Sequence, residues 1–311
     1  MSDAIETLEQ SGLPIHIYAT PQAMGAASAQ ALTDKLIALA ATQDRIGFLI
    51  MAAPSAYGFY DAFLSRTAES APLQNALQRT HFYQFDDYPL PAEHPASFRY
   101  LLNKAFFTPL SQWCPPENIH ALNVESDDPQ AICEAYTQAV LTHGLDVQLK
   151  GVGENGHWGF HEPFVPLQGD PAYISVDLSE ENVHQQLRDH PTLFTTEDQV
   201  PRVAYTANVA LFMKTKHLVE DNIPQASKGF ALVAGYGNDT VDAAVPTSIL
   251  KQHPHAAVRT TQAAAHELLE FRKHDHVTQA SFERMETALG GGSMGDYMRK
   301  VFDAMHIPYE A

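Results

Sequence analysis

The sequence predicts an α/β fold, in which a doubly wound, mainly parallel sheet is flanked by helices and followed by a short helical C-terminal extension. Two observations predict this fold. Strand-like and helix-like segments alternate along most of the 311 residues, and strands separated by helices form βαβ units with parallel strands. The run IGFLIM at residues 46–51 is continuously apolar, as expected of a strand that helices cover on both faces.

The first elements follow one another closely. Residues 14–18 (PIHIY) are predicted to form a short strand. Thr20 followed by Pro21 is typical of a helix start, because threonine caps the first turn and proline at the first helical position loses no hydrogen bond. The helix that follows buries a stripe of leucines at helical spacing, namely Leu32, Leu36 and Leu39.

The remaining elements continue this alternation. Further helices are expected at about residues 56–66, 97–107 and 129–142, and further strands around 80–85, 145–152, 202–206 and 229–234. We expect residues 14–272 to form one domain after an N-terminal extension over residues 1–13. The run Gly290-Gly291-Gly292 is the clearest break in composition, and residues 273–311 are predicted to be a helical tail.

The composition limits the classes of partner. Acidic residues number 37 and basic residues 19, which gives a formal net charge of −18. Such a polyanion is a poor partner for nucleic acid or for an anionic membrane, both of which bind through lysine and arginine. Two cysteines are too few for a disulfide framework. The N-terminal residues MSDAIETLEQSG lack the apolar stretch of a signal peptide, and we expect a cytoplasmic protein.

Two loops carry residues suited to chemistry, and ligands of open α/β sheets bind beyond the carboxyl ends of the strands. The first loop contains Asp86 and Asp87 directly after the run HFYQF. Neighbouring side chains of a strand point to opposite sides, so at most one of these carboxylates lines a cleft. That carboxylate would be a general base if partial burial raises its pKa. The alternative is a turn that simply ends the strand.

The second loop, KGVGENGHWGFHEP at residues 150–163, follows the strand-like run LDVQL. Its glycines permit unusual backbone angles and close approach to a ligand. His157, His161 and Glu162 add groups that transfer protons near neutral pH. Because no helix is predicted to place them on one face, we expect no metal, and no motif indicates a cofactor. The alternative is a tight loop whose polar residues are incidental.

The second loop resembles the signature of glucosamine-6-phosphate deaminases, usually glycine-x-glycine-x-aspartate-glycine-histidine-x-alanine-phenylalanine-asparagine-glutamate-proline. Other family-like motifs occur in the same order and spacing over about residues 14–270. They are Asp86-Asp87-Tyr88, His94-Pro95-x-Ser97-Phe98, Phe106-Phe107, Pro116-Glu117-Asn118-Ile119, Gln199-Val200-Pro201-Arg202 and Pro246-Thr247-Ser248-Ile249-Leu250. The resemblance implies the doubly wound fold shared with 6-phosphogluconolactonases and ribose-phosphate isomerases.

The resemblance also implies roles for single residues. Asp86 would be the base that removes the C2 proton of an open-chain amino sugar, and His157 would assist ring opening. Glu162 would be the carboxylate partner of His157 in that proton relay. Gly153 and Gly156 of the signature would lie against the substrate. The product would be a ketose, released with ammonia.

Several positions depart from the family pattern. Asn155 stands where the deaminases usually carry aspartate, and His161 replaces the usual asparagine. The early phosphate loop of the family keeps only one matching hydroxyl here, that of Ser55. The family lysine is matched with Asn238, and the nearest candidate for the phosphate-binding arginine is Arg188. The loss of fixed cations weakens the case for a phosphorylated substrate.

Three functions therefore compete. The leading one is isomerisation with deamination of an amino sugar phosphate, a small-molecule substrate that we expect to be phosphorylated. The second is a lactonase of the same fold, although Phe160-His161-Glu162-Pro163 keeps the ending typical of deaminases. The third is a catalytically silent sugar-binding or regulatory protein, which Asn155 and the altered phosphate loop favour. Deaminases of this type often form oligomers, and a homo-oligomer is compatible with this sequence.

Overall fold

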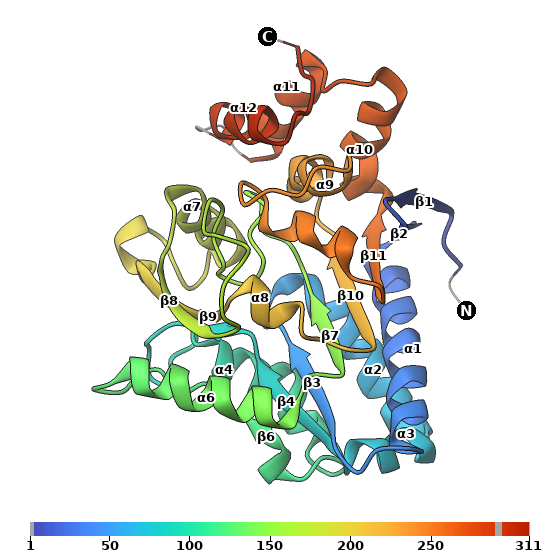
Figure 1. Cartoon of the computed structure of the whole chain (residues 1–311), viewed down its shortest axis with the longest axis vertical. Helices are drawn as coiled ribbons and strands as arrows, with labels where there is room; N and C mark the ends of the chain where they lie inside the picture. Colours follow the sequence, from blue (N-terminus) through green and yellow to red (C-terminus); the bar gives the residue numbers. More distant parts are fainter. Residues whose placement is uncertain (1–2, 290–293, 311) are drawn as a thin grey trace.

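The computed structural model describes residues 3–289 and 294–310, which form a mostly parallel sheet between layers of helices (Figure 1). Eight strands lie in the order β1-β2-β11-β10-β7-β3-β4-β6. Their bounds are Glu6–Gln10 (β1), Leu13–Tyr18 (β2), Ala256–Thr261 (β11), Leu218–Ile223 (β10), Val147–Lys150 (β7), Ile46–Ile50 (β3), Thr80–Gln84 (β4) and Ile119–His120 (β6). All neighbours pair in parallel except β1 and β2, which form an antiparallel hairpin.

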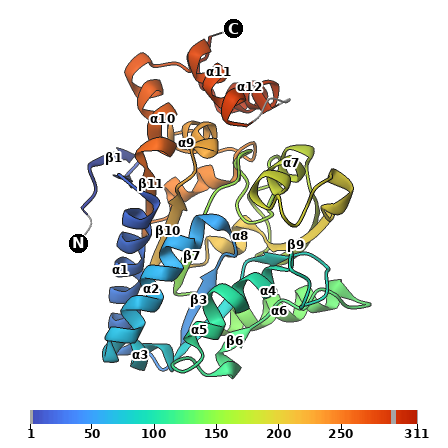
Figure 2. The ribbon, with the colours of Figure 1, turned by 180° about the vertical axis from the view of Figure 1, so that it is seen from behind.

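Helices cover both faces of this sheet. Figure 2 shows α1 and α2 on one face, whereas Figure 1 shows α6 and α8 on the other. The α-helices are α1 (Pro21–Ala40), α2 (Tyr57–Glu69), α3 (Ala71–Leu77), α4 (Phe98–Leu102), α5 (Thr108–Leu110), α6 (Pro129–His143), α7 (Glu180–Asp189), α8 (Val209–Phe212), α9 (Gly229–Tyr236), α10 (Gln262–His274), α11 (Gln279–Ala288) and α12 (Met294–Ala304). A π-helical turn, η2 (Asn103–Phe107), joins α4 to α5. The 3₁₀ turns are η1 (Pro54–Ala56), η3 (Pro116–Asn118), η4 (Glu197–Gln199), η5 (Ala226–Lys228) and η6 (Pro246–Gln252).

A second, antiparallel sheet of three strands stands beside the carboxyl end of β4. Its order is β5 (Asp86–Asp87), β9 (Val203–Ala207) and β8 (Tyr173–Asp177). Asp86 pairs with Thr206 and Asp87 with Tyr205. The chain thus leaves β4, turns at Phe85 and enters the small sheet, which holds Asp86 in extended backbone beside the main sheet.

The predicted fold class is confirmed, and so are most of the predicted elements. Thr20 caps α1, because its hydroxyl accepts a hydrogen bond from the amide of Ala23 at 3.1 Å. The predicted strand over residues 229–234 is wrong, since Gly229–Tyr236 is helix α9. All eight residues of α9 are buried, so its sequence shows no polar face, and periodicity cannot distinguish a fully buried helix from a buried strand.

Both terminal regions contain regular secondary structure. Residues expected to be an N-terminal extension include β1, which pairs with β2 at the edge of the sheet. The C-terminal tail is helical, as predicted, and contains α11 and α12. The glycine run at residues 290–292 lies outside the described residues. In the described part of the chain, every helix is too short or too polar to cross a membrane.

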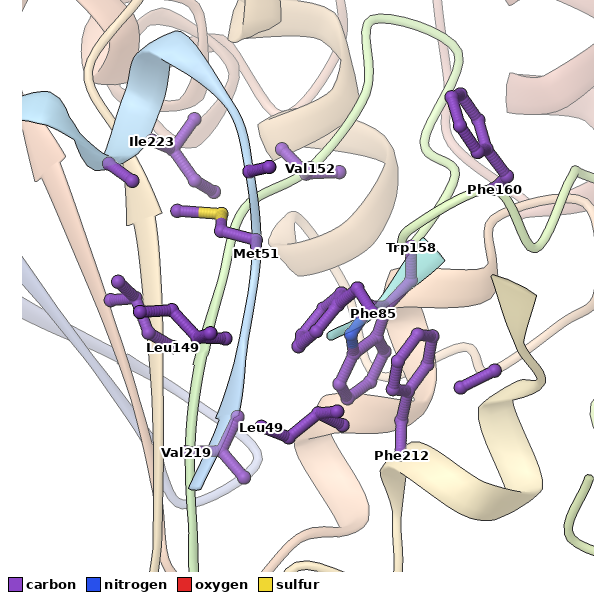
Figure 3. Packing of buried hydrophobic residues seen from close by; sticks show 14 of the residues in the cluster. Leu49, Met51, Phe85, Leu149, Val152, Trp158, Phe160, Phe212, Val219 and Ile223 are labelled. Carbon is purple, nitrogen blue, oxygen red and sulfur yellow. The ribbon is translucent and has the colours of Figure 1, made fainter. Parts of the chain in front are cut away.

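The core around the second loop is aromatic. Trp158 is fully buried and stacks on Phe212, with ring centroids 5.1 Å apart, and Phe85 packs on Phe212 at 4.6 Å (Figure 3). The indole nitrogen of Trp158 also donates a hydrogen bond to the side-chain oxygen of Gln148 in β7, at 3.1 Å. The tryptophan therefore fixes the glycine-rich loop to the strand that precedes it.

Candidate active site

One pocket gathers four of the candidate site residues named above, namely Ser55, Asp86, Gly153 and His157. It lies where the strands β3, β4, β7 and β10 end, which is the usual ligand position in an open α/β sheet. Its lining comes from the loops after these strands, and α7 supplies the remaining wall. Lining residues include Ser55, Phe85, Asp86, Gly153, His157, Phe160, Gln185, Asp189, His190, Gln225 and Lys228.

Asp86 and Asp87 have separate roles in this structure. Asp86 lines the pocket and is 5% exposed, whereas Asp87 does not line it. Asp87 is held by the guanidinium of Arg99 at 2.7 Å and by the amide of Phe98 at 2.8 Å, so its carboxylate stabilises the start of α4. Burial, followed by the charge of Asp87, raises the pKa of Asp86 well above its ordinary value. Asp86 thus places a titratable carboxylate against the ligand space.

The glycine-rich loop folds back so that the His157 ring packs on the backbone of Gly153 in the same loop. A Cβ added to Gly153 would lie 2.1 Å from Cε1 of the His157 ring, so only glycine fits there. Gly153 lines the pocket, but Gly156 does not. Gly156 instead has a φ of +91°, and its Cβ would lie 2.9 Å from Val245, so Gly156 shapes the turn.

His157 is a buried and neutral imidazole. Burial, followed by the charge of Lys228, lowers the pKa of His157 to about 3. Its Nδ1 atom is buried and has no hydrogen-bond partner among the described residues. A neutral imidazole carries one donor and one acceptor nitrogen. This ring can therefore accept a proton at one atom and release a proton from the other.

Glu162 does not line the pocket, and the structure places it with Asn155 in a separate polar cluster. Its carboxylate accepts hydrogen bonds from Asn155 Nδ2 (3.1 Å), Ser179 Oγ (3.0 Å) and Asn182 Nδ2. Asn155 in turn accepts from the backbone amide of His157 at 3.1 Å. Burial raises the pKa of Glu162, and these three donors partly offset that rise. Asn155 thus connects Glu162 to the backbone of His157 and not to its ring.

His161 is a structural residue. Its Nδ1 accepts a hydrogen bond from the amide of Val209 at 3.2 Å, and its Nε2 lies 3.3 Å from the carbonyl oxygen of Val165. An acceptor at Nδ1 and a donor at Nε2 describe the neutral ring. Burial lowers the pKa of His161 to about 4. This histidine joins the loop to α8.

Lys228 lines the pocket and was missed by the sequence analysis. It is 2% exposed, and its ammonium has no hydrogen-bond partner among the described residues. The nearest carboxylate oxygens are those of Asp189 at 3.6 Å and Glu154 at 3.9 Å. Burial alone would raise the pKa of Asp189, but the charge of Lys228 and a hydrogen bond from Gln185 lower it. One sequence signal could have indicated this residue: Lys228 directly precedes Gly229, and it stands at a helix start if residues 229–234 are helical.

The predicted anion-binding residues divide into two groups. Ser55 lines the pocket and is buried. Arg188 does not line it, because its guanidinium pairs with Glu154. Asn238 does not line it either, since its amide donates to the carbonyl oxygen of Met305 at 2.7 Å. Lys228 directly precedes α9 and Asn238 follows it, so the two residues lie at opposite ends of the helix. Of these two, it is Lys228 that lines the pocket.

The residues described here hold no group of three or more histidine, cysteine, aspartate and glutamate side chains arranged to bind a metal ion. The titratable groups that line the ligand space are the carboxylates of Asp86 and Asp189, the imidazoles of His157 and His190, and the ammonium of Lys228. This set can move protons at one part of a ligand and bind an anionic group at another.

Comparison with known proteins gives a consistent result. Residues 19–159 match the family described as glucosamine-6-phosphate isomerases/6-phosphogluconolactonase. A glucosamine-6-phosphate deaminase of Shouchella clausii is 30% identical over 209 residues, which cover 66% of this chain and 79% of the relative. A monomeric glucosamine-6-phosphate deaminase superposes with a TM-score of 0.69 and 24% identity, over 81% of this chain and 98% of that one. A 6-phosphogluconolactonase from Trypanosoma brucei superposes with a TM-score of 0.62 and 15% identity, over 84% and 99% of the two chains.

Proposed function

Because the chain belongs to the glucosamine-6-phosphate isomerase/6-phosphogluconolactonase family, we propose that it isomerises and deaminates an amino sugar phosphate by general acid–base catalysis. The observation that carries the proposal is the meeting of Asp86, His157 and Lys228 in one pocket. A carbon acid next to a carbonyl needs a carboxylate base, ring opening needs a separate proton donor, and a phosphate needs a cation.

Ring opening is assigned to His157. The neutral imidazole takes the proton of the anomeric hydroxyl at one nitrogen and gives a proton to the ring oxygen from the other. The C1–O5 bond breaks, and an open-chain aldehyde forms with no net change in the proton count of the enzyme. The low pKa of His157, about 3, keeps the acceptor nitrogen free at neutral pH.

Proton abstraction is assigned to Asp86. Its carboxylate removes the C2 proton of the open-chain amino aldehyde, and the electron pair of that bond forms the C1–C2 double bond. The aldehyde oxygen takes up a proton from the substrate's own ammonium group, which gives a neutral eneaminol. Asp86 then returns its proton to C1, and the nitrogen lone pair forms a protonated imine at C2. Water then hydrolyses the imine to a ketone, and ammonia leaves. The raised pKa of Asp86 makes it a stronger base than an exposed aspartate.

The anionic end of the substrate is assigned to Lys228 and Ser55. Lys228 offers ammonium N–H groups without hydrogen-bond partners in the described part of the chain, and Ser55 offers a hydroxyl. Ser55 belongs to η1, directly before α2, where backbone amides favour negative charge. The side-chain oxygen of Gln225 is also buried and without a partner among the described residues, so it is a candidate acceptor for a sugar hydroxyl.

Lactone hydrolysis is the second candidate. One observation favours it: Glu162 bonds to Asn155, Ser179 and Asn182 and not to the His157 ring, so the relay expected of a deaminase is incomplete. Hydrolysis of a lactone needs an activated water and an anion site but no base at C2.

An ammonia-release assay over a panel of amino sugars, each with and without a 6-phosphate, tests the leading proposal. We expect release only from phosphorylated members, and we expect Lys228→Met to raise KM by roughly 10- to 100-fold, the range of a lost charged hydrogen bond. Lys214→Met, at an exposed lysine, is the matched control. Hydrolysis of a 6-phosphosugar lactone without ammonia release from any amino sugar would favour the second candidate instead.

A further inference from the structure

The described part of the C-terminal tail, residues 273–289 and 294–310, lies against the turn that carries Lys228. Helix α11 contacts η5, which ends at Lys228, and α12 contacts α9, which begins at Gly229. Figures 1 and 2 show α11 and α12 beyond α9, at the end of the molecule toward which β7 and β10 point. The tail is therefore a neighbour of the candidate active site.

An aromatic cluster fixes the first turn of α9 to the tail. Phe230, two residues after Lys228, packs edge-on against Phe282 of α11 at 5.0 Å and Phe302 of α12 at 5.4 Å. Tyr309 packs against Phe282 at 6.0 Å. Phe230, Phe282 and Phe302 are all buried. Aromatic pairs of this kind contribute directional contacts, so the cluster restricts the orientation of the helix start as well as its depth.

Close backbone approach and polar contacts complete the attachment. A Cβ added to Gly229 would lie 3.0 Å from the side chain of Glu267 in α10 and 3.5 Å from the sulfur of Met285 in α11. The guanidinium of Arg284 holds both carboxylate oxygens of Glu267, at 2.8 and 3.0 Å, which ties α11 to α10. At the far end of α9, Asn238 donates to the carbonyl oxygen of Met305. Helix α9 is thus attached to the tail at both ends.

The tail also lies within electrostatic range of the start of α7. Tyr297 of α12 is half-buried. Burial raises the pKa of its phenol, and the nearby negative charges of Glu181 and Glu162 raise that pKa further. Glu181 belongs to the first turn of α7, and α7 supplies Gln185 and Asp189 to the pocket. The tail therefore contacts the segment that carries Lys228, and Tyr297 lies within electrostatic range of the first turn of α7.

We propose that the C-terminal tail is a positioning element of the pocket. By packing on Gly229 and Phe230 it sets where the ammonium of Lys228 stands, and so it sets how tightly the pocket binds an anionic group. This inference rests on the proposed function, because it takes Lys228 as the anion-binding residue. Phe282 and Arg284 act through Lys228 and are positioning residues.

Phe282→Leu in the full chain tests the inference, because it keeps the site apolar and removes the ring that meets Phe230. Calorimetric titration with inorganic phosphate gives a readout that does not depend on turnover. We expect phosphate affinity to fall roughly 3- to 10-fold, as for mutations that act through a packed network. For a substrate found in the panel, KM should rise by a similar factor while kcat stays within about two-fold.

Two further variants separate positioning from general destabilisation. Phe107→Leu removes a buried ring that packs on Phe82 and Phe106, away from the tail, and should lower Tm without changing phosphate affinity. In a Lys228→Met background, Phe282→Leu should have no further effect on phosphate affinity, since the group it positions is gone. An equal loss of affinity in Phe107→Leu, or an unchanged effect of Phe282→Leu without Lys228, would overturn the inference.

The failures can be told apart. If Lys228→Met weakens phosphate binding and Phe282→Leu does not, the tail inference fails and the proposed anion site stands. If neither substitution changes phosphate affinity, the anion site of the proposed function fails as well.

Discussion

The ammonium of Lys228 and the carboxylate of Asp189 lie 3.6 Å apart in the wall of the pocket. Glu154 brings a second carboxylate to 3.9 Å from the same ammonium, and all three side chains are largely removed from solvent. Two anions therefore flank one cation before a ligand binds. If Lys228 binds the anionic end of the substrate as proposed, a phosphate would compete with Asp189 for its ammonium, and we expect the charge at position 189 to influence substrate choice.

Asp189→Asn should tighten the binding of a phosphorylated substrate. The substitution removes a negative charge a few ångströms from the expected phosphate, and a repulsion of that kind is about 1–2 kcal/mol at a partly solvated site. KM for the phosphorylated sugar should fall about 5- to 10-fold, measured by ammonia release. Asp198→Asn, at an exposed aspartate, should leave KM unchanged. A rise in KM would show that Asp189 contacts the sugar itself.

Asp86→Asn should reduce kcat by roughly 10²- to 10⁴-fold, the usual contribution of a general base. Asparagine keeps the shape and hydrogen bonding of the side chain, so KM should change little. Steady-state kinetics on the substrate found in the panel give both values. The exposed Asp61 offers a control, because Asp61→Asn removes a carboxylate from α2 without touching the pocket. Full activity of Asp86→Asn would exclude proton abstraction by this residue.

Asn155→Asp restores the residue usual in the deaminases, yet this structure predicts that it destabilises the protein. The side-chain nitrogen of Asn155 donates to Glu162 at 3.1 Å, so an aspartate would place two carboxylates in contact. The loss of that donor should lower the free energy of unfolding by about 1–3 kcal/mol at neutral pH. Ammonia release should not rise, because Asn155 bonds to the backbone of His157 and not to its ring.

The pH dependence of this variant gives an independent check. Repulsion between the two carboxylates raises their pKa values in the folded state above those in the unfolded state. The folded state then binds more protons, so lowering the pH should recover the stability relative to the wild type. Denaturant unfolding at about pH 7 and pH 5 measures the difference, and an unchanged difference between the two pH values would argue against contact between the carboxylates.

His161 should make the protein less stable in mild acid. Its pKa is about 4 in the folded state against an ordinary 6.5. Between these pH values the unfolded chain binds a proton at His161 and the folded chain does not, so protonation favours unfolding. Stability is full above pH 6.5 and falls as the pH drops toward 4, by up to about 3 kcal/mol. His161→Asn should flatten this part of the profile of Tm against pH, and a parallel profile would contradict the assignment. His157, whose pKa is also lowered, adds a similar dependence that remains in the variant.

Local signals in the sequence predicted much of this structure. Thr20 and Pro21 mark the start of α1, and the apolar run after Arg45 marks β3, because a cap and a continuous strand are each encoded in a few adjacent residues. The glycine-rich loop predicted a close approach at His157, and Gly153, four residues earlier, leaves the space that the His157 ring occupies. Strand alternation predicted that at most one of Asp86 and Asp87 lines a cleft, and the family resemblance identified it as Asp86.

The remainder depended on tertiary contacts. The sequence does not point to Lys228, because the residues that follow it resemble a strand and a fully buried helix such as α9 has no polar face to show its period. Glu162 was expected beside the His157 ring, but Ser179 and Asn182, seventeen and twenty residues further on, draw its carboxylate toward the start of α7. Arg188 was expected at the anion site, and Glu154, thirty-four residues away, holds it elsewhere. Spacing along the chain does not reveal such partners.

Trp158, which stacks on Phe212, is a buried tryptophan next to the pocket residue His157, so its fluorescence can report on the pocket. The chain contains two tryptophans, and Trp158 is fully buried while Trp113 is half-buried, so the two indoles should differ in emission wavelength. In a Trp113→Phe variant, the fluorescence would arise from Trp158 alone. That indole directly follows His157 and faces the ammonium of Lys150 at 4.5 Å, a nearby charge to which indole emission is sensitive. Ligand occupancy of the neighbouring pocket should therefore be readable as a change in emission, without any turnover and before the natural substrate is identified.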